Sequence, residues 1–168
     1  FGLDPKDTIQ IGTLSKAIGT SGGYVAGTVS LKNYLINVSK AFIFTTAQPP
    51  AIAAAASTAI EIIKNEPTCR HRLWKNRDFL YSELKNIGFQ LTNTQSPILP
   101  IIVKSPEKAL QMSQALYKAG IHIPAIRPPT VPKESSRLRI TVSSGHSKEQ
   151  LQYVIQAINN SGKELFLI

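Results

Sequence analysis

The sequence predicts an α/β protein in two parts, and three patterns along its 168 residues support this. A glycine-rich stretch at residues 11–27 lies between two short segments that are typical of strands. Residues 51–64 are rich in alanine, the best helix former, and a second helical pattern follows and ends at Gly88. From residue 89 onward, strand and helix patterns alternate, as in small α/β domains.

In the first part, residues 8–12 and 24–28 predict short strands on either side of the glycines. Ser30 is a suitable N-cap for a helix over residues 31–38, and the apolar residues 41–45 favour a further strand. The pair Pro49 and Pro50 opens the alanine-rich helix at a position where proline is tolerated. We expect residues 1–66 to form one domain and residues 67–89 a connecting helix.

Residues 90–168 are expected to form a separate small α/β domain with a βαβ-like layout. Residues 99–103, 121–126 and 137–143 predict strands, and Ser105 begins a helix that ends at Gly120. Residues 127–136 contain three prolines and predict a semi-rigid loop. Residues 147–150 match a capping box, which predicts the start of a last helix.

Composition limits the classes of partner. The net charge of +9 favours anionic ligands such as phosphate or coenzyme A. The basic residues are scattered and no zinc or RNA-binding signature accompanies them, so we expect no nucleic-acid partner. Cys69 is the single cysteine, which excludes an internal disulfide and a multi-cysteine metal site; we expect no metal and a cytoplasmic location. No apolar run is long enough to span a bilayer, so no membrane partner is expected.

Lys16 is the residue that the glycine-rich stretch presents. A lysine amine in a site that lowers its pKa is a nucleophile toward aldehydes, which is Schiff-base chemistry. The alternative is an exposed lysine in a glycine-rich turn, and spacing alone leaves the two open. A nucleotide phosphate loop is set aside, because Lys16 follows Ser15 and precedes Ala17 instead of fitting the Gly-Lys-Ser/Thr pattern.

Two motifs resemble one enzyme family. The segment at residues 13–19, followed by residues 21–24, resembles the cofactor-lysine segment of the pyridoxal-phosphate-dependent α-oxoamine synthases. Residues 125–132 and 137–141 resemble a C-terminal signature of one branch of that family. The resemblance implies a fold-type-I transferase with pyridoxal 5′-phosphate (PLP) as its cofactor. The chain would then be the C-terminal part of the large PLP-binding domain plus the small C-terminal α/β domain.

The resemblance also implies roles for particular residues. Lys16 is expected to hold the cofactor covalently and to move the α-proton as a general base, and Thr13 to bind the cofactor phosphate. Thr45 and Thr46 resemble the hydroxyl pair that reaches the phosphate of the neighbouring subunit, which implies a homodimer with a shared active site. Without the resemblance, Thr13 would be assigned to local backbone hydrogen bonding.

Arg139 is the expected clamp for the substrate carboxylate, because a guanidinium group matches a carboxylate with two parallel hydrogen bonds. Arg137 lies two residues away on the same strand face, so alternation cannot separate the two arginines. The family's arginine matches the second position, which favours Arg139. Thr130 lies in the proline-rich loop, which we expect to form a stiff wall near the substrate.

The branch that the signature resembles condenses L-alanine with pimeloyl-CoA, with loss of carbon dioxide, in biotin synthesis. Glycine-using acyltransferases that make aminolevulinate or 2-amino-3-oxobutyrate are the alternatives within the family. Its members are more than twice this long, and the aspartate, aromatic group and glycine-rich phosphate loop that they need upstream have no match here. The chain begins at Phe1 and matches a C-terminal portion, so a binding or dimerisation fragment without activity of its own is the alternative from another class.

Overall fold

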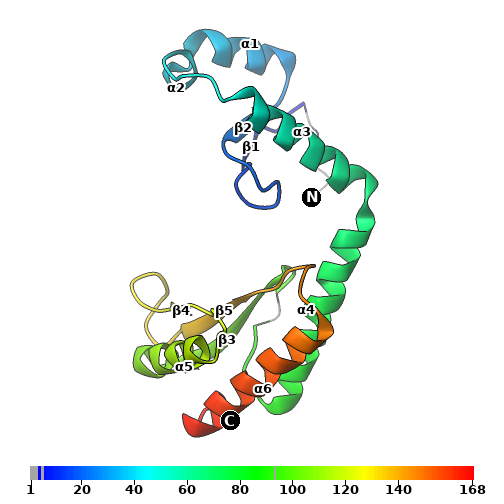
Figure 1. The fold of residues 1–168 in the computed structure, drawn as a ribbon. Coiled ribbons are helices and arrows are strands. Elements are labelled where there is room, and N and C mark those ends of the chain that lie inside the picture. Colours follow the sequence, from blue (N-terminus) through cyan, green and yellow to red (C-terminus); the bar gives the residue numbers. More distant parts are fainter. Residues whose placement is uncertain (1–3, 5, 93) are drawn as a thin grey trace. The chain divides into compact units, whose positions relative to one another are not determined.

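The computed structural model describes residue 4, residues 6–92 and residues 94–168, and it divides into two compact units, Phe1–Pro67 and Thr68–Ile168. Both units contain helices and strands, in agreement with the expected α/β class (Figure 1). Each unit is described by itself below.

The first unit begins with a β-hairpin. Strand β1 (Gln10–Thr13) pairs antiparallel with β2 (Gly23–Ala26), and the register places Gly12 opposite Tyr24. A Cβ atom at position 12 would lie 2.5 Å from the Tyr24 ring, so only glycine lets that ring lie across the strand. The hairpin thereby holds the segment of residues 14–22 as a closed loop.

Three helices follow the hairpin: α1 (Val29–Val38), α2 (Lys40–Ile43) and α3 (Pro50–Asn65). The N-cap of α1 is Thr28, whose hydroxyl accepts the N–H of Leu31 at 3.2 Å, so the expected cap at Ser30 is wrong by two residues. The strand expected at residues 41–45 is also wrong. The carbonyl of Ser39 instead accepts the N–H groups of Phe42 and Ile43, which closes a helical turn.

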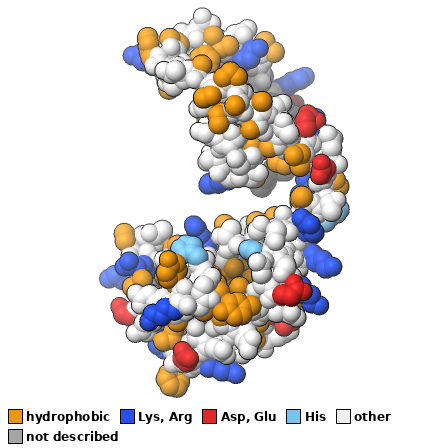
Figure 2. Space-filling model, viewed as in Figure 1, with side chains coloured by type: hydrophobic (Ala, Val, Ile, Leu, Met, Phe, Trp, Pro, Cys, Tyr) orange, Lys and Arg blue, Asp and Glu red, His pale blue; other side chains and the backbone are white. Residues whose placement is uncertain are grey.

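Large apolar side chains of the first unit are mostly exposed. Among its described residues, Ala56 on α3 is the only hydrophobic residue that is buried. Ile11 on β1 is 79% exposed and Phe44 after α2 is 80% exposed. Hydrophobic side chains accordingly appear on the surface around α1 and α3 in the space-filling view (Figure 2). The first unit therefore has little core of its own.

The second unit contains the long helix α4 (Pro67–Ile87), β3 (Ile98–Lys104), α5 (Pro106–Lys118), β4 (Ala125–Ile126), β5 (Ser136–Thr141) and α6 (Lys148–Glu164). The expected capping box is present at the start of α6. Ser147 Oγ accepts the N–H of Gln150, and the Gln150 side chain accepts the N–H of Ser147.

The sheet of the second unit has the order β3-β5-β4, and both pairings are antiparallel. β3 and β4 therefore run parallel to each other but are not neighbours in the sheet. β5, which follows both in the sequence, lies between the two strands of the expected βαβ-like unit. The strand expected at residues 121–126 is reduced to two residues. Pro124 has no N–H to donate, which limits the ladder at this end.

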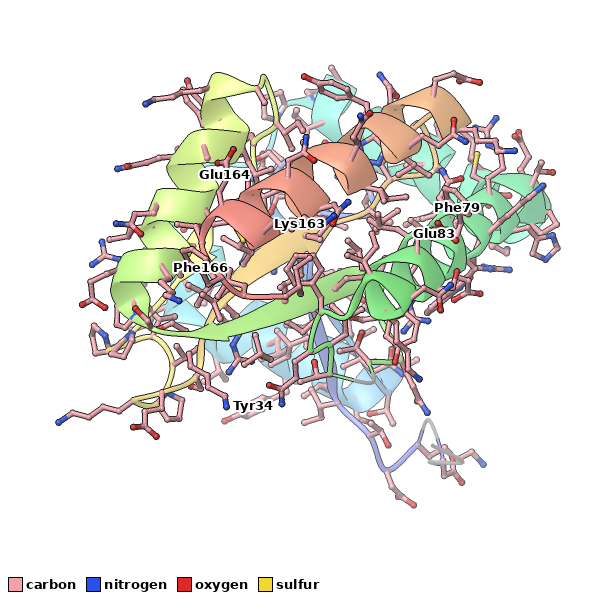
Figure 3. All side chains as sticks on the ribbon, turned by 90° about the horizontal axis from the view of Figure 1, so that it is seen from below. Tyr34, Phe79, Glu83, Lys163, Glu164 and Phe166 are labelled. Atoms are coloured by element: carbon pink, nitrogen blue, oxygen red, sulfur yellow. The ribbon has the colours of Figure 1, made fainter. Side chains whose placement is uncertain are left out.

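The core of the second unit lies between this sheet and its helices. Leu138 and Ile140 of β5 are buried while Arg139 between them is exposed, which is the alternation of a sheet covered on one face. Helix α5 packs against all three strands and against α6. Leu80 and Leu84 bring α4 into the same core. Figure 3 shows Phe79 and Glu83 on α4, and Lys163 and Glu164 on α6 with Phe166 just beyond its end.

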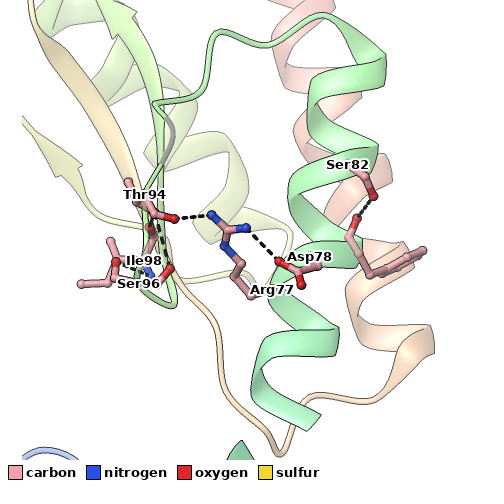
Figure 4. Close-up of polar contacts among 7 residues, drawn as sticks. Arg77, Asp78, Ser82, Thr94, Ser96 and Ile98 are labelled. Atoms are coloured by element: carbon pink, nitrogen blue, oxygen red, sulfur yellow. Dashed lines mark hydrogen bonds and ion pairs between the residues drawn. The ribbon is translucent and has the colours of Figure 1, made fainter. Parts of the chain in front are cut away.

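Arg77 ties α4 to the segment before β3. Its guanidinium pairs with Asp78 at 2.8 Å and donates to the carbonyl of Thr94 (Figure 4). The Arg77 side chain is only 11% exposed, and its guanidinium carbon lies 4.7 Å from the centre of the Tyr81 ring. Contacts to an aromatic face, a carboxylate and a carbonyl offset part of the desolvation of this charge, while the buried Nε of Arg77 has no hydrogen-bond partner among the described residues.

Candidate active site

Lys16 lies in the loop that joins β1 and β2, and its side chain is exposed. Two main-chain hydrogen bonds of 2.9 Å close the base of this loop. The N–H of Leu14 donates to the carbonyl of Gly22, and the N–H of Thr20 donates to the carbonyl of Leu14. Gly22 has a φ of +107°, a conformation that favours glycine. The amine of Lys16 is thus presented at the tip of a tightly bonded loop.

Hydroxyl groups surround the base of this loop. Thr13 and Ser15 share a hydrogen bond between their hydroxyls at 2.8 Å, and the N–H of Ser15 donates to Thr13 Oγ1 at 3.3 Å. Thr13 is exposed, so its hydroxyl remains accessible. Thr20 Oγ1 is buried and has no hydrogen-bond partner among the described residues. A buried hydroxyl without a partner is uncommon in proteins.

The segment after α2 returns to the lysine loop. A Cβ atom built on Gly22 would lie 3.6 Å from Nε2 of Gln48, so this amide lies beside the loop. Thr46 stands two residues before Gln48 and is exposed. Thr45 is also exposed, although its hydroxyl donates to the carbonyl of Ala41 at 2.6 Å. Among the described residues, the Thr45 hydroxyl bonds to α2 and the Thr46 hydroxyl does not.

Arg137 and Arg139 differ in their surroundings on β5. The Nε–H of Arg137 donates to the carbonyl of Ser135 at 2.9 Å, and its side chain is partly buried. Arg139 is exposed and forms no ion pair among the described residues. The geometry thus leaves the guanidinium of Arg139 available for a ligand, while that of Arg137 is engaged in the loop before the strand.

Arg139 lines a pocket of about 590 Å³ within the second unit. This volume lies in the range of small-molecule sites. Its apolar walls come from α4, β5 and α6, and its polar side chains include those of His122, His146 and Tyr153. Thr130 is exposed in the proline-rich loop, where its N–H donates to the carbonyl of Arg127 at 3.0 Å, and it does not line this pocket.

Two residues that sequence analysis did not assign contribute to these sites. Gln48 carries no motif of its own and is placed beside Gly22 only by the chain's return after α2. Asn76 on α4 donates its side-chain N–H groups to the carbonyls of Ser143 and His146, both at 3.0 Å. These contacts join positions about seventy residues apart, and neither residue had a local signal in the sequence.

The described part of the chain shows no group of three or more His, Cys, Asp or Glu side chains arranged to hold a metal ion. Within the same residues, none of the helices combines the length and the apolar character needed to cross a bilayer.

Comparison with known proteins shows relatives along the whole chain. A family model described as aminotransferase class I and II matches residues 1–158. The chain is 46% identical to the 8-amino-7-oxononanoate synthase of Lysinibacillus sphaericus and 42% identical to that of Symbiobacterium thermophilum, in each case over 168 residues. It spans 43% of the length of each of these relatives, that is, less than half.

Solved structures give the same family. A high-resolution structure of SPT with a PLP internal aldimine is 32% identical, with a TM-score of 0.90 over 95% of this chain and 41% of that chain. The 8-amino-7-oxononanoate synthase of Francisella tularensis is 28% identical, with a TM-score of 0.81 over 94% of this chain and 46% of that chain. The fold-type-I assignment is confirmed by this likeness. With its family model matched over residues 1–158, the chain belongs to the aminotransferase class I and II family.

Proposed function

We propose that the chain is part of a PLP-dependent acyltransferase that condenses L-alanine with pimeloyl-CoA to 8-amino-7-oxononanoate, with loss of carbon dioxide and coenzyme A, in the cytoplasmic synthesis of biotin. The observation that carries the proposal is the lysine loop. In this loop the exposed amine of Lys16 lies near the hydroxyl groups of Thr13 and Ser15. The chain is also 46% identical, over its whole length, to a protein named 8-amino-7-oxononanoate synthase. Its share of 43% of that relative makes the activity a property of a longer polypeptide or assembly.

The residues of the loop fit a phosphorylated aldehyde. The amine of Lys16 is exposed and can condense with an aldehyde, while Thr13 and Ser15 offer hydroxyl donors. When bound, PLP supplies an electron sink for bonds at the substrate's α-carbon. Lys16 then holds and returns the α-proton at its amine nitrogen, and Thr13 binds the phosphate.

Arg139 orients the amino-acid substrate in this proposal. Its guanidinium is exposed and free of ion pairs within the described residues, so it can bind the α-carboxylate through two parallel hydrogen bonds. Arg137 is the weaker choice because its Nε–H already bonds to Ser135. Thr130 contributes a hydroxyl from the proline-rich loop, which the prolines hold in few conformations.

A homodimer completes the proposed site. Thr46, with Thr45 before it, offers its hydroxyl to the phosphate bound by the partner subunit. The exposed apolar side chains of the first unit support an interface of this kind, since such side chains in a soluble protein are usually covered by another surface.

The experiment is reductive labelling of the chain. We expect that PLP followed by borohydride modifies Lys16 first, and that Lys16→Ala removes this label while Lys32→Ala, which changes an exposed lysine on α1, leaves it. Peptide mass mapping gives the modified residue, and circular dichroism confirms that both variants fold. Modification spread evenly over the lysines would contradict an assembled cofactor site in this chain.

Substrate choice is tested separately in the complete enzyme. An alanine-using synthase should release coenzyme A from pimeloyl-CoA with alanine much faster than with glycine. Faster release with glycine, together with succinyl-CoA or acetyl-CoA, would instead favour the aminolevulinate or 2-amino-3-oxobutyrate enzymes. Arg139→Lys keeps the charge but loses the bidentate geometry, so it should raise KM for the amino acid.

A second candidate function is a binding or dimerisation fragment without turnover of its own. The scarcity of buried apolar side chains in the first unit favours it, because such a unit gains little from its own packing. Mixing the chain with the complementary portion of a relative distinguishes the two. Recovered turnover would identify a complementing part of the enzyme, whereas a stable but inactive complex would favour the fragment.

A further inference from the structure

Gln48 lies beside the loop that carries Lys16, although it belongs to a different segment of the first unit. A Cβ atom built on Gly22 would lie 3.6 Å from Nε2 and 3.9 Å from Cδ of the Gln48 side chain. The carbonyl of the same glycine accepts the N–H of Leu14 at 2.9 Å and the hydroxyl of Thr13 at 3.4 Å. Gln48 and Thr13 therefore contact one residue, Gly22, from two different segments of the chain.

The backbone on both sides of Gln48 is constrained. Gln48 precedes Pro49, and a proline ring disfavours the helical conformation for the residue before it. Pro49 has φ −54° and ψ 140°, and its carbonyl accepts the N–H of Ile52 at 2.9 Å in the first turn of α3. At the other end of the segment, the hydroxyl of Thr45 donates to the carbonyl of Ala41 in α2. The segment that carries Gln48 is therefore short and is anchored to a helix at each end.

The amide of Gln48 is available to a ligand. The side chain is exposed and forms no hydrogen bond among the described residues. Its nitrogen is the atom nearest to the Cβ position of Gly22, so the donor end of the amide lies at the loop. A neutral amide nitrogen offers two N–H donors, and a phosphate group offers three strongly accepting oxygens. The amide of Gln48 and the hydroxyl of Thr13 thus place donors of two kinds around the base of the same loop.

We propose that Gln48 is a further cofactor-binding residue, whose amide N–H groups donate to the phosphate that Thr13 binds. The inference rests on the function proposed above, because the phosphate is that of PLP. Gln48 is assigned to the site of its own chain, since the glycine that it contacts lies in the loop of the same Lys16. Its amide raises the affinity for the phosphorylated aldehyde and holds it while the Lys16 amine reacts.

The test compares PLP with pyridoxal, which has the same ring and aldehyde but no phosphate. Each aldehyde is titrated into the full chain and trapped with borohydride, and peptide mass mapping measures the modification of Lys16. Gln48→Leu nearly keeps the size of the side chain and removes the amide. It should raise the half-saturating concentration of PLP roughly two- to tenfold, the equivalent of one net hydrogen bond, and leave that of pyridoxal unchanged.

Two further variants provide the matched comparison. Gln48→Glu has nearly the same shape but sets a negative charge beside the phosphate, so it should weaken PLP more than Gln48→Leu does and leave pyridoxal unchanged. Gln152→Leu makes the same exchange at an exposed position of α6 in the second unit, and it should change the modification by neither aldehyde. Each variant is measured with both aldehydes, so an effect on the phosphate is distinguished from damage to the loop.

The outcomes separate this inference from the proposed function. If PLP modifies Lys16 equally well in Gln48→Leu and in the unmodified chain, the role of Gln48 is overturned while the proposed cofactor site stands. An equal loss with PLP and with pyridoxal would also overturn it, because Gln48 would then support the loop without binding the phosphate. If PLP shows no preference for Lys16 in the unmodified chain, the proposed cofactor site fails and the inference fails with it.

Discussion

Asn76 should stabilise the second unit through the two carbonyls that it bridges. Its side chain donates to Ser143 and His146 at 3.0 Å each, and a typical hydrogen bond contributes about 0.5–1.5 kcal/mol net. Because both bonds are exposed, water can replace part of the loss. Asn76→Ala should therefore lower the free energy of unfolding by about 1–2 kcal/mol, the lower part of the summed range.

Asn76→Asp provides the sharper comparison. A carboxylate has nearly the same shape but no N–H, so it would set oxygen against two carbonyl oxygens. The aspartate variant should be less stable than the alanine variant. Asn86→Ala is the matched control, since Asn86 is exposed on the same helix and forms no side-chain hydrogen bond among the described residues. It carries the same change in helix propensity without loss of a bond.

The assay is urea unfolding followed by the fluorescence of Trp74, the single tryptophan, which lies on α4. With an m-value of about 2 kcal/mol per molar urea, the middle of the usual range, the alanine variant should lower the midpoint by about 0.5–1 M relative to the control. An aspartate variant as stable as the alanine variant, or an alanine variant that unfolds with the control, would refute the assigned role of Asn76.

Two further predictions concern packing and pH. A Cβ atom at Gly162 would lie 2.5 Å from the buried ring of Phe89. Gly162→Ala should therefore lower the free energy of unfolding of this unit by about 1–3 kcal/mol, although alanine has the better helix propensity. In a double-mutant cycle measured by thermal unfolding, Phe89→Leu in the same chain should restore much of this loss. The Ser105 hydroxyl donates to the Glu107 carboxylate at 2.7 Å and lowers the pKa of that group, with a smaller contribution from the Glu107 backbone. This support for the start of α5 is present above the ordinary glutamate pKa and is lost as pH falls through the lowered one. Ser105→Ala should raise the pKa of Glu107 toward its ordinary value in an NMR titration, and an unchanged titration would contradict the assignment.

Local pattern was sufficient to predict most helices of this protein. The alanine-rich run and the capping box at Ser147 depend on propensity and on contacts within a few residues, and α3 and α6 form where those patterns lie. Strands were less predictable, because a strand exists only when another strand pairs with it. Residues 41–45 have strand-like composition but close a helical turn, and Pro124 shortens the strand expected at residues 121–126.

The candidate site also has a part that the sequence predicted and a part that only the structure revealed. The sequence by itself determined that Lys16 would stand in a glycine-rich loop with hydroxyls beside it, because that loop is one continuous segment. Alternation could not distinguish Arg137 from Arg139, since residues two apart share a strand face. In the structure, Arg137 bonds locally to the carbonyl of Ser135, whereas tertiary packing leaves Arg139 in the pocket. The contacts of Asn76 were likewise decided by tertiary structure, because they depend on segments that folding brings together from distant parts of the chain.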